Sequence, residues 1–245
     1  HLIVLHHGFH GTTHDLRLIR NYLKVLAPNV LVLNAESNQS NPDASIAEMG
    51  MRLAAEVRRF VATRCPDLTD PNAPPGGRLS FIGHSAGSVI VRAALTHRLM
   101  EPLLPQLHAM LSLSSPHLGT LYSGAVVSTG MWAIRKASGE GKGRWRRSAI
   151  LEELMLVDTP NGEVGDEGYL SWLSRQQGLE LFRYVLLVSA FRDAYVPMHS
   201  ARIQLCDAAI RDAEAGVANG IAVARMVNNL LGPLDRRKVF RLNLY

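Results

Sequence analysis

The sequence has few cysteines and no long apolar run, and each shortage excludes a class of protein. Cys65 and Cys206 are the only cysteines in 245 residues, too few for a disulfide scaffold, and no Cys-x-x-Cys pair typical of a zinc site occurs. No apolar stretch approaches the roughly 18 residues of a membrane-spanning helix. The net charge of +5 favours anionic surfaces. No basic stripe interleaved with aromatic residues is visible, so a nucleic-acid partner is not indicated.

The composition is that of a globular protein. Hydrophobic residues make up 47% of the chain, and its length suits one α/β domain with a buried core. The chain opens with His1 and runs straight into apolar residues, so we expect residues 1–245 to be a single domain from a longer protein. Localisation therefore stays unknown. The two unpaired-looking cysteines weakly favour a reducing, cytoplasmic compartment.

Short apolar runs alternate with helical patterns along the chain. Most of the runs are continuous, which is typical of strands covered on both faces of a parallel sheet. The alternation predicts an α/β fold, a three-layer sandwich with about six parallel strands. The predicted strands are 2–8, 30–37, 78–85, 110–116, 184–190 and 238–245.

Helical patterns fill the gaps between these runs. Residues 44–64 carry apolar side chains at spacings of three and four, and Ser45 with Glu48 resembles a capping box at their start. Residues 86–100 are interpreted as a buried helix. Residues 199–231 are mostly helical in pattern, with Gly216 and Gly220 as candidate breaks.

A long segment, 121–180, interrupts the alternation and is interpreted as a cap or lid insertion. Apolar residues within it are candidates for a surface that faces an acyl chain: Met131, Trp132, Leu151, Leu154 and Met155. A basic cluster at 135–147 is a candidate for peripheral contact with an anionic membrane. The competing interpretation is a solvated, glycine-containing loop.

The motif with the clearest chemistry is Gly83-His84-Ser85-Ala86-Gly87, a Gly-x-Ser-x-Gly pentapeptide. Such a motif marks a serine nucleophile when it joins a strand to a helix in a sharp turn. Here RLSFIGHS supplies a strand before it and SVIVRAAL a helix after it. Ser85 is therefore the predicted nucleophile. The alternative is an ordinary glycine-rich turn between a strand and a helix.

An acyl-transfer nucleophile needs backbone amides that stabilise an oxyanion. One predicted donor is the amide of Ala86, which follows the nucleophile. The other is the amide of Phe9, in the loop after the first strand, where His7 and Gly8 are expected to shape the turn. The alternative for this loop is again a plain glycine turn.

The triad order in such folds is serine, then an acid, then histidine. Asp193 stands a few residues past the strand 184–190 and is the predicted acid, unless it only caps a turn. The base is open. His199 is the only histidine after Asp193, and the favoured alternative is a histidine beyond Tyr245.

The remaining histidines are interpreted as non-catalytic. His84 is expected to pack beneath Ser85, and His117 to shape the rim of the site. His6, His7, His10 and His14 are four histidines close in sequence, but neighbours on a strand face opposite ways and no carboxylate or cysteine spacing completes a zinc site. We predict neither a metal nor an organic cofactor.

Four stretches carry a resemblance to a known family: HHGFHGTTHDLRLIRNYL, GHSAGSVIVRAAL, LSLSSPHLGTLY and RDAYVPMHSARIQLC. They are similar to the lipase-like serine esterase domain, most closely the C-terminal domain of the eukaryotic proteins named family with sequence similarity 135. The resemblance covers nearly the whole chain and is weakest at 135–180. It implies an α/β-hydrolase fold and lipid-directed esterase activity, with Ser85 as nucleophile, Asp193 as acid and His7–Gly8 as the oxyanion turn. In that family a histidine-containing stretch follows the last core strand.

The sequence therefore predicts a serine hydrolase that cleaves carboxylic esters, lipid esters above all, through an acyl-serine intermediate. Two alternatives stay open. One is a catalytically inactive hydrolase domain that serves as an interaction module. The other is an acyltransferase or thioesterase, which uses the same acyl-enzyme chemistry.

Overall fold

The computed structural model describes residues 1–70, 76–123, 148–159 and 168–245. Within these ranges six strands form one sheet in the order β2-β1-β3-β4-β5-β6, and every neighbouring pair is parallel. The α/β class and the parallel sheet predicted from the sequence are confirmed. The strands are β1 (Leu2–His6), β2 (Leu31–Asn34), β3 (Leu79–His84), β4 (Leu107–Leu113), β5 (Tyr184–Ala190) and β6 (Val239–Leu244).

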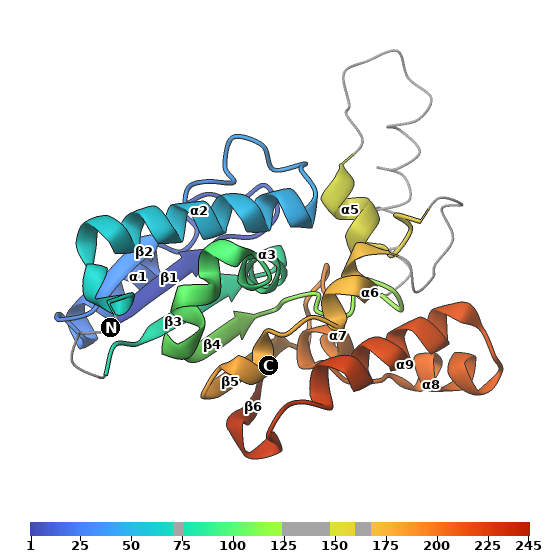
Figure 1. Cartoon of the computed structure of the whole chain (residues 1–245). Helices are drawn as coiled ribbons and strands as arrows, with labels where there is room; N and C mark the ends of the chain where they lie inside the picture. Colours follow the sequence, from blue (N-terminus) through green and yellow to red (C-terminus); the bar gives the residue numbers. More distant parts are fainter. Residues whose placement is uncertain (71–75, 124–147, 160–167) are drawn as a thin grey trace, which may run out of the picture.

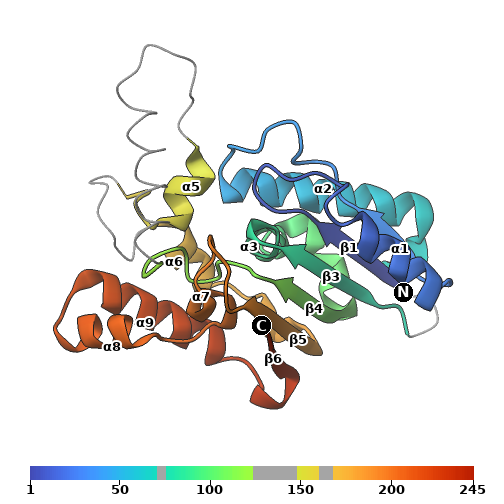
Figure 2. The same cartoon turned by 180° about the vertical axis from the view of Figure 1, so that it is seen from behind.

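The sheet is covered by helices on both faces (Figures 1 and 2). Residues of β1 alternate between the two sides: Leu2 and Val4 join the larger core cluster with α2 (Ile46–Arg64) and α3 (Ala86–Leu95). Ile3 and Leu5 join a smaller cluster with residues of α1 (Arg17–Leu26). Both faces of β1 are buried, which explains why its sequence is continuously apolar.

The other helices lie near the carboxyl ends of the strands or beyond β5 (Figure 1). They are α5 (Ala149–Leu154), α6 (Tyr169–Ser174), α7 (Met198–Arg202), α8 (Asp207–Glu214) and α9 (Ala218–Leu231). Short 3₁₀ segments are η1 (Pro66–Leu68), η2 (Arg98–Gln106), η3 (Leu179–Leu181) and η4 (Arg236–Lys238). Of the predicted insertion 121–180, the structure describes 121–123, 148–159 and 168–180. Its basic cluster 135–147, Met131 and Trp132 lie outside the described residues.

Two helix predictions need correction. The helix predicted at 86–100 ends at Leu95, because His97 adopts an extended backbone and its side chain accepts a hydrogen bond from the Leu99 amide at the start of η2. Gly216, with φ of 76°, does separate α8 from α9. Gly220 does not break the helix: it lies inside α9, where an added Cβ would be 2.3 Å from the backbone nitrogen of Ala213.

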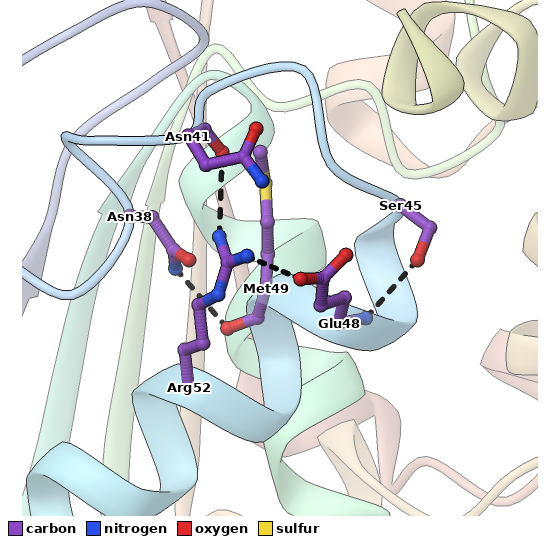
Figure 3. A network of polar contacts seen from close by, with 6 residues as sticks. All are labelled: Asn38, Asn41, Ser45, Glu48, Met49 and Arg52. Carbon is purple, nitrogen blue, oxygen red and sulfur yellow. Dashed lines mark hydrogen bonds and ion pairs between the residues drawn. The ribbon is translucent and has the colours of Figure 1, made fainter.

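The start of α2 is fixed by polar contacts (Figure 3). The Ser45 hydroxyl accepts a hydrogen bond from the Glu48 amide at 3.2 Å, as the capping motif predicts. The reciprocal half of a capping box is replaced, because the Glu48 carboxylate pairs with Arg52 one turn further on. The Ile46 amide donates instead to the carboxylate of Glu153, 2.6 Å away in α5. This contact joins α5, which lies in the predicted insertion 121–180, to the start of α2.

We expect Gly50→Ala, in the interior of α2, to lower the free energy of unfolding by about 1–3 kcal/mol. Helix propensity alone predicts the opposite, a gain of about 1 kcal/mol. The difference arises because an added Cβ would lie 2.7 Å from the Ala93 Cβ and 2.8 Å from the backbone of α3. Thermal unfolding measures the effect. Gly178→Ala is the control, since nothing lies within 4 Å of its added Cβ. A higher melting temperature for Gly50→Ala would contradict this packing.

Candidate active site

Ser85 occupies the sharp turn between β3 and α3. Its backbone has φ of 52° and ψ of −129°, a conformation that costs a non-glycine residue about 1–3 kcal/mol and persists only where the surroundings enforce it. The Ser85 amide donates to the Leu113 carbonyl of β4 at 2.8 Å, and the Ser85 carbonyl accepts from the Ser115 hydroxyl at 2.6 Å. The side chain is half-buried, and its hydroxyl makes no hydrogen bond to the described residues.

Two glycines of the motif are required by close contact. A Cβ at Gly83 would lie 2.5 Å from the Ser88 hydroxyl oxygen, and one at Gly87 would lie 2.5 Å from the His6 carbonyl oxygen. Real Cβ atoms do not approach so closely, so any larger residue would push α3 away from the sheet. The glycines thus let the amino terminus of α3 approach β1 and β3.

Both predicted oxyanion donors lie at the same pocket as Ser85. Ala86 begins α3, and Phe9 follows Gly8 in the loop after β1. Gly8 lies against the serine: an added Cβ would be 2.9 Å from the Ser85 Cβ. Within the described residues, neither the Phe9 nor the Ala86 amide donates to another group. Both are therefore available to an external oxygen, as an oxyanion hole requires.

The pocket is a cavity of about 590 Å³ at the carboxyl ends of the strands. Its wall is mainly apolar and includes Phe9, Pro116, Leu151, Leu154 and Val196. Leu151 and Leu154 come from α5, so the predicted insertion contributes to this wall. No lysine or arginine is found among the described residues that line it. A pocket of this size and composition suits a small molecule or part of a lipid.

Asp193 lines the same pocket, three residues past the end of β5. Its Oδ1 accepts hydrogen bonds from the amides of Tyr195 and Val196, at 2.9 Å and 3.0 Å. These two bonds fix the carboxylate in a turn after the strand. Oδ2 accepts no hydrogen bond from the described residues. The geometry therefore allows Asp193 both a turn-capping and a histidine-orienting role.

His199 is not among the described residues that line the pocket. It lies in α7, where its half-buried ring packs edge-on against Tyr122 with centroids 6.2 Å apart. Burial lowers the pKa of His199, and a hydrogen bond with the Leu121 backbone opposes that shift. The structure thus brings Ser85 and Asp193 to one pocket, whereas His199 packs against Tyr122 at the start of the predicted insertion 121–180.

The other histidines named in the sequence analysis differ in their exposure to solvent. His84 is exposed and lines the pocket, so it does not pack beneath Ser85 as expected. His117 is fully buried, so its expected place at the rim is also wrong. Its Nε2 bonds to the Ser112 hydroxyl at 2.8 Å, its carbonyl accepts from Arg92, and burial lowers its pKa well below the ordinary range. His7 is buried beside the oxyanion loop, and its Nδ1 lies 2.9 Å from the Gly8 carbonyl oxygen.

The residues that the structure describes offer neither a cluster of metal ligands nor a membrane-spanning helix. No three His, Cys, Asp or Glu side chains among these residues are close enough together to hold a metal ion. None of the helices described here is long and apolar enough to cross a membrane.

The parallel sheet, the strand–serine–helix turn and the pocket at the carboxyl ends of the strands define an α/β-hydrolase fold. The family model described as "Putative serine esterase (DUF676)" matches residues 1–208, and the chain belongs to this family.

Solved structures that match with a TM-score of 0.50 or more agree with the fold. A structure of the metagenome-derived lipolytic enzymes LipS and LipT matches with a TM-score of 0.51 and 12% identity, over 100% of this chain and 83% of that one. The lin2722 gene product of Listeria innocua matches with a TM-score of 0.50 and 11% identity, over 98% and 97%. Phospholipase PlaB of Legionella pneumophila matches with a TM-score of 0.47 and 17% identity. That match covers 81% of this chain and only 40% of the phospholipase.

Glu153, next to the pocket wall in α5, generates a pH-dependent prediction. Burial raises the pKa of this carboxyl from 4.5 to about 8, Asp158 and Glu152 add to the shift, and the hydrogen bond from Ile46 opposes it. The fold therefore favours the neutral form. The neutral Glu153 carboxyl contributes fully to the free energy of unfolding below pH 4.5, and this contribution is lost as the pH rises through 8. Glu153→Gln cannot ionise and keeps an oxygen acceptor for the Ile46 amide.

We expect Glu153→Gln to be more stable than the wild type at pH 9, by a few kcal/mol at most, and to differ little near pH 4. Melting temperatures of both proteins across this range test the prediction. Glu101→Gln is the control, because Glu101 is an exposed carboxyl in η2 and is not among the groups that shift the pKa of Glu153. Parallel pH profiles for Glu153→Gln and wild type would show that the carboxyl is not held neutral.

Proposed function

We propose that the protein is a serine hydrolase that cleaves carboxylic esters through an acyl intermediate on Ser85. One observation carries the proposal: Ser85 is held in a strained turn at the head of α3, beside two backbone amides that have no acceptor among the described residues. Such a turn persists where the surrounding contacts favour it, and it presents the hydroxyl to the pocket. Membership of the serine esterase family supports the same chemistry.

In the proposed reaction, the Ser85 oxygen attacks the ester carbonyl carbon while a base accepts the hydroxyl proton. The carbonyl oxygen becomes an oxyanion stabilised by the amides of Phe9 and Ala86, and the positive end of the α3 dipole adds to this effect. The carbon–oxygen bond to the alcohol then breaks, and the base returns the proton to the departing alcohol. Water repeats the sequence, releasing the acid and free Ser85.

Asp193 is the proposed partner of the base. Its Oδ1 is occupied by the amides of the 195–196 turn, which leaves Oδ2 to accept a hydrogen bond from an imidazole. This arrangement supports a role in orienting the base and stabilising its charged form.

For the base itself we propose a histidine that follows β6 in the natural protein. The end of β6 lies beside the Asp193 loop: the Phe191 amide donates to the Leu244 carbonyl at 3.0 Å, and the Phe191 and Tyr245 rings stack with centroids 6.5 Å apart. A side chain placed there approaches Asp193 from the neighbouring strand end. His199 is the second candidate and requires a rearrangement of α7, because its ring packs on Tyr122.

The substrate class we propose is a neutral ester with an apolar acyl chain. Support comes from the apolar wall and from the two carboxylates, Asp15 and Asp193, that line the pocket without a described cation.

Contact with a membrane surface is a second part of the proposal. It is supported by the exposed side chains of Phe191, Arg192 and Tyr195 near the pocket, a mixture of aromatic and basic groups that suits an anionic interface.

Within the family, we propose that this chain is related to the C-terminal domains of the proteins named family with sequence similarity 135. The four stretches of resemblance in the sequence support this placement.

An acyltransferase or thioesterase is a second function that the same pocket supports, since only the acceptor or the leaving group differs. An inactive interaction module is the alternative if Ser85 proves unreactive.

Labelling with a fluorophosphonate probe tests the proposal, because such probes react with an activated serine. We expect the chain carrying any sequence that follows Tyr245 in the natural protein to be labelled, and Ser85→Ala to abolish the label.

Asp193→Asn should slow ester turnover about 10⁴-fold, as the equivalent change does in a Ser-His-Asp triad.

The base is assigned by repeating the labelling on residues 1–245 alone and on His199→Ala. Labelling of the extended chain only supports a base after Tyr245. Labelling of residues 1–245 that is lost in His199→Ala assigns the base to His199. Folded protein that stays unlabelled in every form contradicts the esterase proposal and favours the interaction module.

A further inference from the structure

The orientation of the oxyanion loop depends on a chain of buried polar contacts that begins outside the pocket. This inference rests on the proposed function, since it concerns the amide of Phe9. The Gly8 carbonyl accepts hydrogen bonds from the Gly11 amide at 3.0 Å and from Nδ1 of His7 at 2.9 Å. A trans peptide is planar, with its C=O and N–H pointing in opposite directions. Holding the Gly8 carbonyl therefore aims the Phe9 N–H the other way.

The preceding peptide is held in the same manner by His6. Nδ1 of His6 lies 2.8 Å from the His7 carbonyl oxygen, and since a carbonyl only accepts, Nδ1 carries the proton. The two imidazole rings stack at 5.0 Å with an interplanar angle of 26°. A change of tautomer at His6 would replace this hydrogen bond by a repulsive contact between two acceptors.

Asn38 favours the same tautomer from the other ring nitrogen. Its Nδ2 donates to the Met49 carbonyl at 3.1 Å, which fixes the direction of the side-chain amide. The same Nδ2 lies 2.9 Å from Nε2 of His6, so Nε2 must accept. Burial lowers the pKa of His6 to about 3, with a smaller effect from His7, so the ring stays neutral and keeps this acceptor.

Asn38 is itself anchored on α2. Figure 3 shows its side chain directed to the carbonyl of Met49, in the first turn of the helix, beside the Arg52 contacts that hold the Asn41 carbonyl. The residues just before it are tied to the same helix. The Glu56 carboxylate accepts from the Glu36 amide at 3.0 Å and from the Ser37 amide at 3.0 Å.

A small cavity lies beside the same residues. His6, His7, Phe9 and Asn38 are among the residues that line a cavity of about 10 Å³, the room of about one water molecule. Nε2 of His7 and Oδ1 of Asn38 are buried without a partner among the described residues. A water bound between them would satisfy both atoms and connect Asn38 to the second ring.

We propose that Asn38 is a positioning residue for the oxyanion loop, acting through the tautomer of His6 on the peptides that precede the Phe9 amide. The contacts run from Met49 in α2 through Asn38 and His6 to the His7 carbonyl. Asn38 touches neither Ser85 nor the pocket.

The test compares Asn38→Leu with Asn41→Leu in the full chain. Both asparagines lie in the same loop, but only the backbone of Asn41 is used in the contacts described. With a p-nitrophenyl ester, we expect Asn38→Leu to lower kcat about 10- to 100-fold with KM unchanged. That loss lies below the about 10²–10³-fold cost of removing an oxyanion donor outright. Inhibition by a trifluoromethyl ketone, which forms a tetrahedral adduct, should weaken by a similar factor. Asn41→Leu should leave all three values unchanged.

Unchanged kcat in Asn38→Leu, or equal losses in both variants, overturns the proposal. If Asn38→Leu does not fold, Asn38→Ser takes its place. The wild-type protein gives an independent answer: ¹⁵N chemical shifts should show His6 as the neutral Nδ1–H tautomer, and an Nε2–H tautomer overturns the proposal without any variant. If the wild-type protein is inactive but His6 is the Nδ1–H tautomer, the result counts against the esterase function and not against the contacts between Asn38, His6 and the His7 carbonyl.

Discussion

The close approach of α3 to the sheet is the constraint on which the site depends. Ser85 keeps a positive φ because both sides of its turn are fixed, by the hydrogen bond to Leu113 and by the contact between Gly87 and the carbonyl of His6. The same approach places the first amide of α3 beside the Gly8 turn. The strained serine, the two free amides and the mouth of the pocket are thus consequences of one packing arrangement.

Helix α2 supports this arrangement from the outside. It packs on α3 through Gly50, where no side chain separates the two helices, and its first turn holds the loop that contains Asn38. The Ile46 amide of the same turn holds Glu153, and with it the segment of α5 that lines the pocket. One helix therefore positions both the loop that carries Phe9 and part of the apolar pocket wall, although it contributes no residue to the described pocket lining.

Much of the fold follows from local sequence. Strands β1 and β3 are buried on both faces, so their continuous apolar runs predicted them. The glycines around Ser85 predicted a sharp turn, and the structure shows that they allow close packing there. Errors arose where tertiary contacts decide. Gly220 stays helical because α8 packs against it. His84, as the last residue of β3, points to the pocket, whereas the side chain of His117 turns inward to Ser112.

Asn38 could not be found from the sequence. Its role rests on a hydrogen bond to a residue 32 positions away, and no local pattern signals the tautomer of a buried histidine. The base of the proposed triad lies equally beyond local reasoning, because its identity depends on which imidazole can reach Asp193 in space. A sequence motif identifies the nucleophile, because the motif forms the turn that carries it. The acid and the base have no such local motif and are identified only by their positions in the folded protein.

The most direct test of the account is to trap the acyl-enzyme. The protein is mixed with a slowly deacylating ester, quenched in acid and analysed by intact mass and peptide mapping. A single acyl group on the peptide that contains Ser85, absent in Ser85→Ala, is the predicted result. An acyl group on another residue, or ester turnover that persists in Ser85→Ala, would contradict the central role of this serine.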